Sequence, residues 1–215
     1  ILGITVIVLS ILNMFRMGLY LIGSDIYAIK LMRSKKQRKT RFTPYVTVIV
    51  PAHNEEAIIE DCLNSIVANK YPNSRLSIVV ANDGSTDKTR SIVQRYIRNN
   101  TSNITIKLMN QKNKGKAAAL NNAIKRHVKT PYFMCLDADS LLHEDAIYCG
   151  VQQFTDKRVV AVAANVNIIE DGTMLGLLQR FEYLISYNMK KAQVLYNIEY
   201  ITGGIGSLFR RTAVV

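Results

Sequence analysis

Short apolar runs alternate with helical segments from Tyr45 onward, and this alternation limits the possible folds more than any other feature of the sequence. The predicted strands are residues 46–50, 76–81, 104–109, 132–136 and 159–164. The predicted helices are residues 54–68, which Asn54 is placed to cap, 86–98, 116–127 and 143–154. Apolar strands separated by helices are typical of a mainly parallel sheet with helices on both faces. The sequence therefore predicts an α/β fold.

The first 29 residues are almost wholly apolar, and a dense basic cluster follows them. Seven Lys and Arg residues and no acidic residue lie between Lys30 and Arg41. About 20 apolar residues suffice to cross a bilayer as a helix, and flanking basic residues favour the cytoplasmic side. We expect a transmembrane helix at 1–29, a basic cytoplasmic linker at 30–44 and a cytoplasmic catalytic domain at 45–215, all at the cell membrane. A helix lying on the membrane surface is the alternative, and a signal peptide is less favoured because the basic residues come second.

Arg16 interrupts the apolar segment near its middle. An arginine at that depth costs roughly 3 kcal/mol on insertion scales. Asp25 lies nine residues away, about half a turn out of phase on a helix, and cannot pair with it. We expect Arg16 either to extend toward the interface or to face another transmembrane helix, which implies other transmembrane subunits as partners.

The net charge of +12 does not indicate a nucleic-acid partner, because it is concentrated beside the apolar segment. Removing the seven charges of the cluster leaves 12 − 7 = +5 for residues 42–215. The three cysteines are odd in number and lack CxxC spacing, so that disulfides and thiolate metal sites are not expected. This cysteine usage fits a reducing compartment.

Acidic residues follow three of the predicted strands. In parallel sheets ligands bind beyond the carboxyl ends of the strands, so that these residues are expected to converge. Asp137 and Asp139 are two residues apart and, in extended backbone, leave the chain on the same side. Paired carboxylates suit Mg²⁺ or Mn²⁺ that is shared with a phosphate group, although a solvated loop has the same pattern. Asp83 ends another strand, where it either forms a turn or accepts a hydrogen bond from a base.

Lys116 follows Gly115 at the start of a predicted helix. A lysine at a helix N-terminus places positive charge where a phosphate binds, and a solvated lysine pair is the alternative. The glycines between Thr202 and Gly206 lack the third glycine and the acidic residue of a dinucleotide-binding motif. The histidines lack ligand spacing and stay unassigned, and the residues from Arg211 are expected to begin a helix.

Five motifs occur in a fixed order: Val-Thr-Val-Ile-Val-Pro-Ala-His-Asn-Glu (46–55), Ala-Asn-Asp-Gly-Ser-Thr-Asp (81–87), Asn-Lys-Gly-Lys-Ala-Ala-Ala-Leu-Asn (113–121), Leu-Asp-Ala-Asp (136–139) and Thr-Gly-Gly-Ile-Gly-Ser-Leu-Phe-Arg-Arg (202–211). With them the chain resembles the processive family 2 glycosyltransferases, the group of poly-N-acetylglucosamine, chitin and hyaluronan synthases. The resemblance covers residues 42–215 and implies the GT-A fold of nucleotide-diphospho-sugar transferases. It also implies an inverting, membrane-bound enzyme that extends a polysaccharide from a UDP-sugar, expected to be UDP-N-acetylglucosamine.

The resemblance also implies roles for single residues. On the donor side, Ala52, Glu55 and Asp83 line the uridine site, Lys116 reaches the diphosphate, Asp137 contributes to the sugar and diphosphate site, and Asp139 holds the metal ion. On the acceptor side, Gly203 and Gly204 lie near the growing polysaccharide or lipid acceptor, as do Gln179, Glu182 and Tyr183 of a helix at 175–196.

The catalytic base of the family is an aspartate some tens of residues after the Phe-Arg-Arg segment, followed by a Gln-x-x-Arg-Trp motif. This sequence has no tryptophan and no Glu-Asp pair after residue 171. We therefore expect a C-terminally incomplete catalytic domain that holds the donor and metal half only, contains no catalytic residue and is inactive as a fragment. The alternatives are single glycosyl transfer to a lipid phosphate, as in dolichyl-phosphate mannose synthases, and a non-catalytic nucleotide-sugar-binding subunit.

Overall fold

The computed structural model describes residues 2–37, 41–169, 172–199, 203 and 205–214. Contacts between residues divide the chain into two compact units. The first unit, called the helical unit, combines Ile1–Thr40 with Asn165–Ile201. The second, called the sheet unit, combines Arg41–Ala164 with Thr202–Val215.

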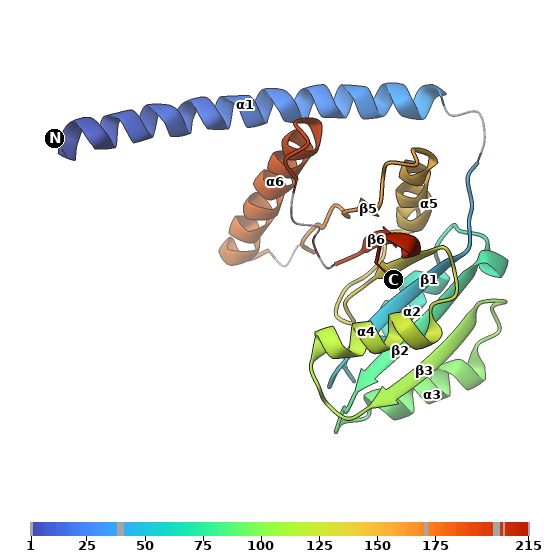
Figure 1. Cartoon of the computed structure of the whole chain (residues 1–215). Helices are drawn as coiled ribbons and strands as arrows, with labels where there is room; N and C mark the ends of the chain where they lie inside the picture. The colour runs from blue at the N-terminus through green and yellow to red at the C-terminus, as the bar shows by residue number, and fades with distance from the viewer. Residues whose placement is uncertain (1, 38–40, 170–171, 200–202, 204, 215) are drawn as a thin grey trace. The chain divides into compact units, whose positions relative to one another are not determined.

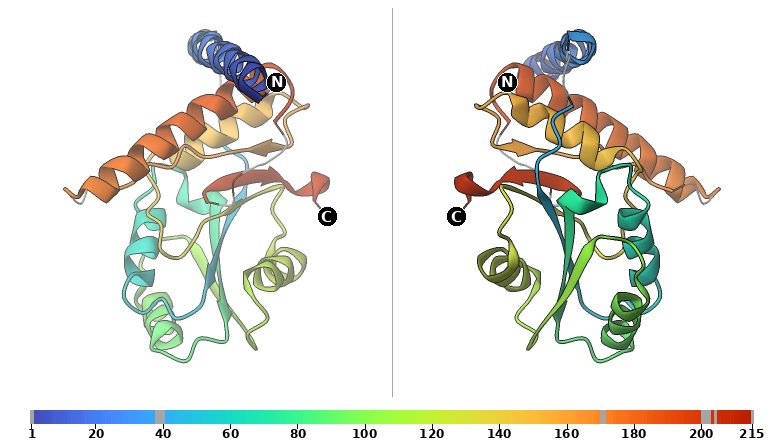
Figure 2. Two further views of the ribbon diagram at one scale, coloured as in Figure 1. Left: turned by 90° about the vertical axis from the view of Figure 1, so that its left-hand side faces the viewer. Right: turned by 90° about the vertical axis from the view of Figure 1, so that its right-hand side faces the viewer.

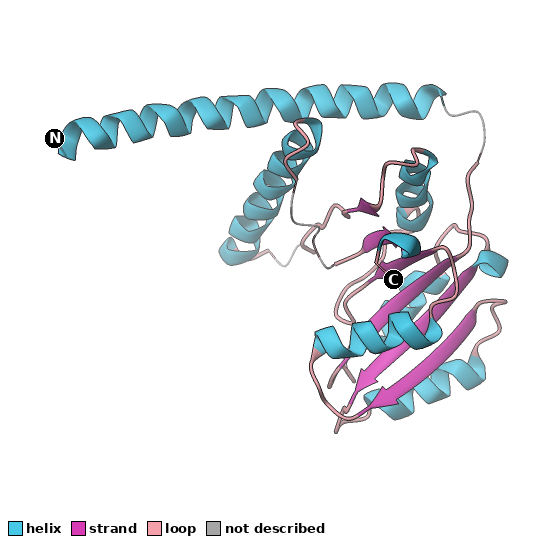
Figure 3. Ribbon diagram, viewed as in Figure 1, coloured by secondary structure: helices cyan, strands magenta, loops and turns pink. Residues whose placement is uncertain are grey.

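The sheet unit contains a six-stranded sheet in the order β3-β2-β1-β4-β6-β5 (Figures 1 and 3). Its parallel strands are β1 (Val46–Ala52), β2 (Leu76–Asp83), β3 (Thr105–Gln111) and β4 (Tyr132–Cys135). Two shorter strands complete it: β6 (Ser207–Arg210) runs antiparallel to β4, and β5 (Ala161–Val162) runs antiparallel to β6. The α/β fold with a mainly parallel sheet is confirmed.

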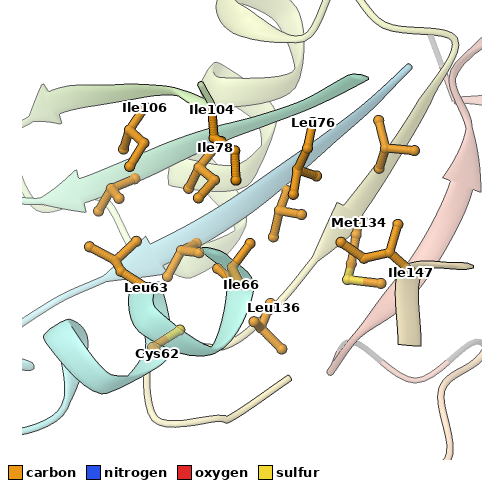
Figure 4. Packing of buried hydrophobic residues seen from close by; sticks show 14 of the residues in the cluster. Cys62, Leu63, Ile66, Leu76, Ile78, Ile104, Ile106, Met134, Leu136 and Ile147 are labelled. Atoms are coloured by element: carbon orange, nitrogen blue, oxygen red, sulfur yellow. The ribbon is translucent and has the colours of Figure 1, made fainter. Parts of the chain in front are cut away.

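Helices cover both faces of this sheet, as the two side views in Figure 2 show. Successive side chains of a strand point to opposite faces, so that a strand between two helical layers is apolar throughout. In β1, Val48 belongs to the cluster that includes α2 (Ile59–Val67) and α3 (Thr89–Asn99), whereas Ile49 belongs to the cluster that includes α4 (Lys116–His127). Figure 4 shows the first cluster, in which Leu63 and Ile66 of α2 face the strands. Burial of each such aliphatic side chain stabilises the fold by roughly 1.5–3 kcal/mol.

Several predicted element bounds were wrong, because contacts distant in sequence end or extend the elements. The helix expected from residue 54 begins at Ile59, and Asn54 does not cap it. Its Oδ1 instead accepts a hydrogen bond from the backbone N–H of Thr86 (2.8 Å), in the neighbouring loop. The expected helix 143–154 is α5 (Ala146–Val151) followed by the 3₁₀ helix η2 (Gln152–Thr155). The helix expected from Arg211 is the 3₁₀ turn η3 (Arg211–Ala213), and a further turn, η1, spans Asn73–Arg75.

The segment just before β1 is held to the sheet unit by hydrogen bonds. The backbone N–H of Phe42 donates to Gln152 Oε1 (3.3 Å), and Gln152 Nε2 donates to the Phe42 carbonyl (2.6 Å). Tyr71 donates to the carbonyl of Pro44, and the Arg75 guanidinium donates to Thr43. The residues from Arg41 to Pro44, expected to belong to the linker, therefore pack as part of this unit.

The helical unit contains α1 (Leu2–Gln37) and α6 (Met174–Leu195). The stretch Gly3–Arg33 of α1 is long and apolar enough to cross a membrane, and it is the one such helix among the described residues. The helix continues beyond the boundary expected at residue 29. Within α1, Arg16 Nη2 donates to Asn13 Oδ1 (2.8 Å).

The two helices meet where small and polar residues allow close approach. A Cβ atom on Gly23 would lie 2.7 Å from the hydroxyl of Tyr196, which donates to the carbonyl of Leu19 (3.0 Å). Ser24, which is buried, donates through Oγ to Asn188 Oδ1 of α6 (3.0 Å). Because these contacts tie residues 165–201 to α1, the expected single domain 45–215 is divided between two units.

Candidate functional site

A cavity of about 150 Å³ lies at the carboxyl ends of β1, β2 and β4 in the sheet unit. Its lining residues come from the ends of β1 and β2, from the loops that follow β1 and β4, and from the start of α4: Pro51, Ala52, His53, Glu55, Asp83, Lys116, Asp137, Ala138 and Asp139. The structure therefore brings together all six residues that were expected on the donor and metal side. The register of the parallel strands explains this, because Ala52 pairs with Asn82 at one edge of the sheet.

Asp83 is the last residue of β2 and is buried beneath the cavity. Its Oδ1 accepts hydrogen bonds from Gln111 Nε2 (2.7 Å) and from the backbone N–H of Lys114 (3.0 Å). Burial opposes ionisation of this carboxyl, but the hydrogen bonds outweigh it and hold the pKa of Asp83 below its ordinary value. Asp83 is therefore a fixed, ionised acceptor at neutral pH, suited to a hydrogen-bond donor on a ligand.

His53 also lines the cavity, although its only signal in the sequence is its place next to Asn54-Glu55 after a strand. Its Nδ1–H donates to the Asp83 carbonyl (2.8 Å), and its Nε2 accepts from Asn113 Nδ2 (3.3 Å). His53 thereby joins three loops: its own, the one after β2 and the one before α4.

Lys116 is the first residue of α4, and its Nζ lies 2.7 Å from Asp137 Oδ1. The lysine side chain is 55% exposed, whereas that of Asp137 is 19% exposed. Glycine at 115 has a φ of 86°, which L-residues rarely adopt, and it directs the chain into the helix. The helix N-terminus and the ammonium group together favour an anion at this end of the cavity.

Four carboxylates line the cavity, those of Glu55, Asp83, Asp137 and Asp139. Asp137 and Asp139 do not lie on extended backbone as expected, since Ser140 N donates to the Asp137 carbonyl (3.1 Å) and closes a turn. The Asp139 side chain is exposed, with Ser140 Oγ donating to its Oδ1 (3.2 Å). Burial, and after it the charge of Asp139, raises the pKa of Glu55. The excess of negative charge favours a bound cation.

The described residues contain no group of three or more His, Cys, Asp or Glu side chains arranged to hold a metal ion. Mg²⁺ and Mn²⁺ do not require such a group, because they keep waters and bind through one or two carboxylates and substrate phosphates. Burial raises the pKa of Cys62, beneath the cavity, to about 12, so that its thiol stays protonated. The donor set therefore fits a hard divalent ion that a phosphate group helps to hold.

The residues expected on the acceptor side are not gathered in this cavity. Gln179 and Glu182 lie on exposed parts of α6 in the helical unit, and so does Tyr183. Glu182 also lines a second cavity of about 330 Å³ along one face of α6. Gly203, in the sheet unit, accepts a hydrogen bond from Ser207 Oγ at its carbonyl, whereas Gly204 lies outside the described residues.

Comparison with known sequences identifies one family and a set of relatives. The family described as Glycosyl transferase family 2 matches residues 47–215. A poly-β-1,6-N-acetyl-D-glucosamine synthase of Staphylococcus aureus (strain COL) is 36% identical over 172 residues, which cover 79% of this chain and 40% of that protein. The enzyme of the same name from Staphylococcus epidermidis is 31% identical over the same length, with the same coverage. The chain thus spans about 40% of the length of these relatives.

Solved structures show the same architecture. A mannosyltransferase from Pyrobaculum calidifontis, in complex with GDP-Man and Mn²⁺, has a TM-score of 0.67 and 26% identity, covering 92% of this chain and 55% of the other. Staphylococcus aureus TarS, in complex with UDP-GlcNAc, has a TM-score of 0.53 and 24% identity, covering 59% of this chain and 36% of the other. At that identity TarS supports the fold alone. These solved structures therefore share the fold of this chain.

Proposed function

The chain belongs to glycosyltransferase family 2, and on this premise we propose that it forms the donor-binding part of an inverting enzyme that extends a polysaccharide from UDP-N-acetylglucosamine. The observation that carries the proposal is the convergence of Glu55, Asp83, Lys116, Asp137 and Asp139 on one cavity. The choice of sugar follows the two poly-β-1,6-N-acetyl-D-glucosamine synthases, which are 36% and 31% identical to this chain.

The uridine of the donor occupies the end of the cavity that Ala52, Glu55 and Asp83 line. Asp83 accepts a hydrogen bond from the N–H of the base, which its low pKa and fixed carboxylate favour. A base that presents an acceptor there would place two lone-pair atoms against each other beside a buried carboxylate, which disfavours its binding. Uracil is therefore preferred to a base that presents an acceptor at this position.

The diphosphate lies between Lys116 and the two aspartates of the 137–139 turn. Lys116 donates to phosphate oxygens at the start of α4, while Asp137 orients the sugar and the diphosphate. Asp139 holds Mg²⁺ or Mn²⁺, an assignment supported by its exposure and by the carboxylate excess around it. When bound, such an ion supplies Lewis-acid stabilisation of the departing diphosphate.

Transfer with inversion requires a base that takes the proton of the acceptor hydroxyl as that oxygen attacks the anomeric carbon and UDP leaves. We assign this base to none of the described residues. Gly203, Gly204, Gln179 and Glu182 remain our candidates for the path of the acceptor, which is a growing polysaccharide.

The apolar helix α1 anchors the enzyme in the cell membrane with the sheet unit in the cytoplasm. This topology is supported by the length of the apolar stretch of α1 and by the basic residues that flank it.

The donor can be identified by thermal unfolding of the purified chain in detergent with Mn²⁺ and a panel of UDP-N-acetylglucosamine, UDP-glucose and GDP-mannose. A ligand that binds only the folded chain stabilises it by about 2.7 kcal/mol at a hundredfold excess over its dissociation constant. We expect UDP-N-acetylglucosamine to raise the melting temperature most. A larger shift with GDP-mannose would contradict the choice of donor, and no shift with any of the three would contradict the donor site itself.

A further inference from the structure

Asn54 carries the backbone through a left-handed turn just after β1. Its φ is 58°, and Asn197 is the only other non-glycine residue with a positive φ among those that the structure describes. Asparagine tolerates this region because its short polar side chain can hydrogen-bond locally. The backbone N–H groups of residues 54, 55 and 56 then face the loop after β2, where they donate to Ser85 Oγ (3.1 Å), Thr89 Oγ1 (2.8 Å) and Asp87 Oδ2 (3.1 Å).

The loop after β2 donates in return. The backbone N–H of Thr86 donates to Asn54 Oδ1 (2.8 Å), and that of Lys88 donates to Glu56 Oε2 (2.8 Å). We call these reciprocal bonds between residues 54–56 and 85–89 the loop clasp. Neither segment belongs to a strand: residues 54–56 precede α2, and residues 85–88 precede α3, which begins at Thr89. The clasp thus satisfies backbone groups that secondary structure leaves unpaired.

Glu55 is the one residue of the clasp whose side chain lines the donor cavity. Residues 54 and 56 direct their side chains to the partner loop, while Glu55 between them faces Asp137 and Asp139 across the cavity. The backbone N–H of Glu55 donates to Thr89 Oγ1 (2.8 Å), so that the clasp fixes the point from which the Glu55 side chain reaches the cavity.

We propose that Asn54 is a positioning residue of the donor site, which fixes the Glu55 carboxylate at the cavity through the loop clasp. Asn54 itself is not among the lining residues, so that it acts on a bound nucleotide only through Glu55. The inference rests on the proposed function, because the ligand whose binding it controls is the UDP part of the donor.

A double-mutant cycle tests it, with UDP titrated calorimetrically into the detergent-solubilised chain in the presence of Mn²⁺. Asn54→Gly keeps the turn, because glycine adopts a φ of 58° readily, and removes only the side-chain acceptor. We expect it to weaken UDP binding about tenfold, and to have no further effect when Glu55 is already replaced by alanine. Asn197→Gly is the matched control, because it makes the same change at a φ of 57° in the helical unit. We expect this variant to bind UDP with the affinity of the unsubstituted chain.

The outcomes separate the inference from the proposed function. The first outcome is that the unsubstituted chain binds UDP and that Asn54→Gly lowers the UDP affinity equally whether residue 55 is glutamate or alanine. This would show that Asn54 does not act through Glu55, and it would overturn the inference alone. Unchanged affinity of Asn54→Gly would do the same. Failure of the unsubstituted chain to bind UDP would overturn the proposed function and the inference with it.

Discussion

At the scale of single residues, Lys116 and Asp137 are charge partners of each other in the cavity. Their side chains form an ion pair of 2.7 Å, although in the proposed function Lys116 contacts the diphosphate and Asp137 belongs to the donor and metal side. The lysine end of this pair is more than half exposed, so that water screens the attraction and a ligand can separate the pair at small cost. Binding of the cation and of the nucleotide should therefore respond in opposite directions to loss of the lysine.

We expect Lys116→Gln to bind Mn²⁺ alone more tightly, by about two- to fivefold, because Asp137 loses its internal partner. The same variant should bind UDP about tenfold or more weakly, because a charge-assisted hydrogen bond to phosphate is lost. Titration of MnCl₂ into the nucleotide-free chain, and of UDP at saturating Mn²⁺, measures both. Lys70→Gln, which breaks the Lys70–Glu144 pair outside the cavity, should change neither affinity, and a fall in both affinities for Lys116→Gln would contradict the ion-pair account.

The depressed pKa of Asp83 predicts a pH dependence of stability. In the unfolded chain this carboxyl titrates near its ordinary value of about 4, and in the folded chain it titrates lower. Its ionised form therefore stabilises the fold above about pH 4, and this contribution is lost as the pH falls through the folded pKa. Urea unfolding of the unsubstituted chain and Asp83→Asn at pH 7 and pH 3 should show a stability difference at pH 7 that shrinks at pH 3. A stability difference that does not change with pH would mean that ionisation of Asp83 does not stabilise the fold.

At the scale of elements, the sequence predicted the four parallel strands and α4 well, because their signals are local, whereas the strand expected at 159–164 is reduced to Ala161–Val162. The run from Val46 is apolar on both faces, and α4 spans Lys116–His127, as expected. The start of α2 was misplaced because Asn54 bonds to Thr86, 32 positions away in sequence. Strand β6 was missed because its partner, β4, lies far from it along the chain. The hydrophobic periodicity of a sequence does not indicate which distant segments pair with each other.

The glycines of two loops provide a test at the same scale. Gly84 has a φ of 68°, and a Cβ there would lie 2.6 Å from the backbone N of Asn113, whereas Gly115 has a φ of 86° and nothing within 4 Å of the added atom. Gly115→Ala should cost about 1–3 kcal/mol from backbone strain alone, because a φ of 86° with a ψ of 157° is a conformation that is almost confined to glycine. Gly84→Ala should cost more, about 3 kcal/mol or above, because the loops must also separate. Urea unfolding measures both, and equal costs would show that the loops after β2 and before α4 are not in tight contact.

At the scale of the whole molecule, the gathering of the proposed donor and metal residues in one cavity could be predicted, because parallel strands bring their carboxyl ends to one edge of the sheet. The acceptor residues could not be assembled in the same way, since Gln179 and Glu182 lie in the helical unit and Gly203 lies in the sheet unit. Family motifs imply the roles of these residues one by one. They do not indicate the contacts that group residues 165–201 with α1, such as that of Ser24 with Asn188.

The position of the basic residues predicts the topology of the molecule. Arginine and lysine follow the apolar stretch of α1, so that the sheet unit should lie in the cytoplasm. A reporter active only in the cytoplasm, fused after Arg41, should be active, and one active only outside should be silent. Replacement of the basic residues between Lys30 and Arg41 by glutamine should weaken this preference. The opposite pattern of reporter activity in the unsubstituted chain would contradict the proposed location.

The central claim is that the cavity at the strand ends holds UDP and a divalent ion together. Calorimetric titration of UDP into the purified chain tests it most directly, with Mn²⁺ present or removed by EDTA, and with Asp139→Asn beside the exposed control Asp61→Asn. We predict a single site whose affinity falls about tenfold or more without Mn²⁺, a loss that Asp139→Asn reproduces and Asp61→Asn does not. Absence of binding in Mn²⁺, or the same affinity in EDTA as in Mn²⁺, would contradict the claim.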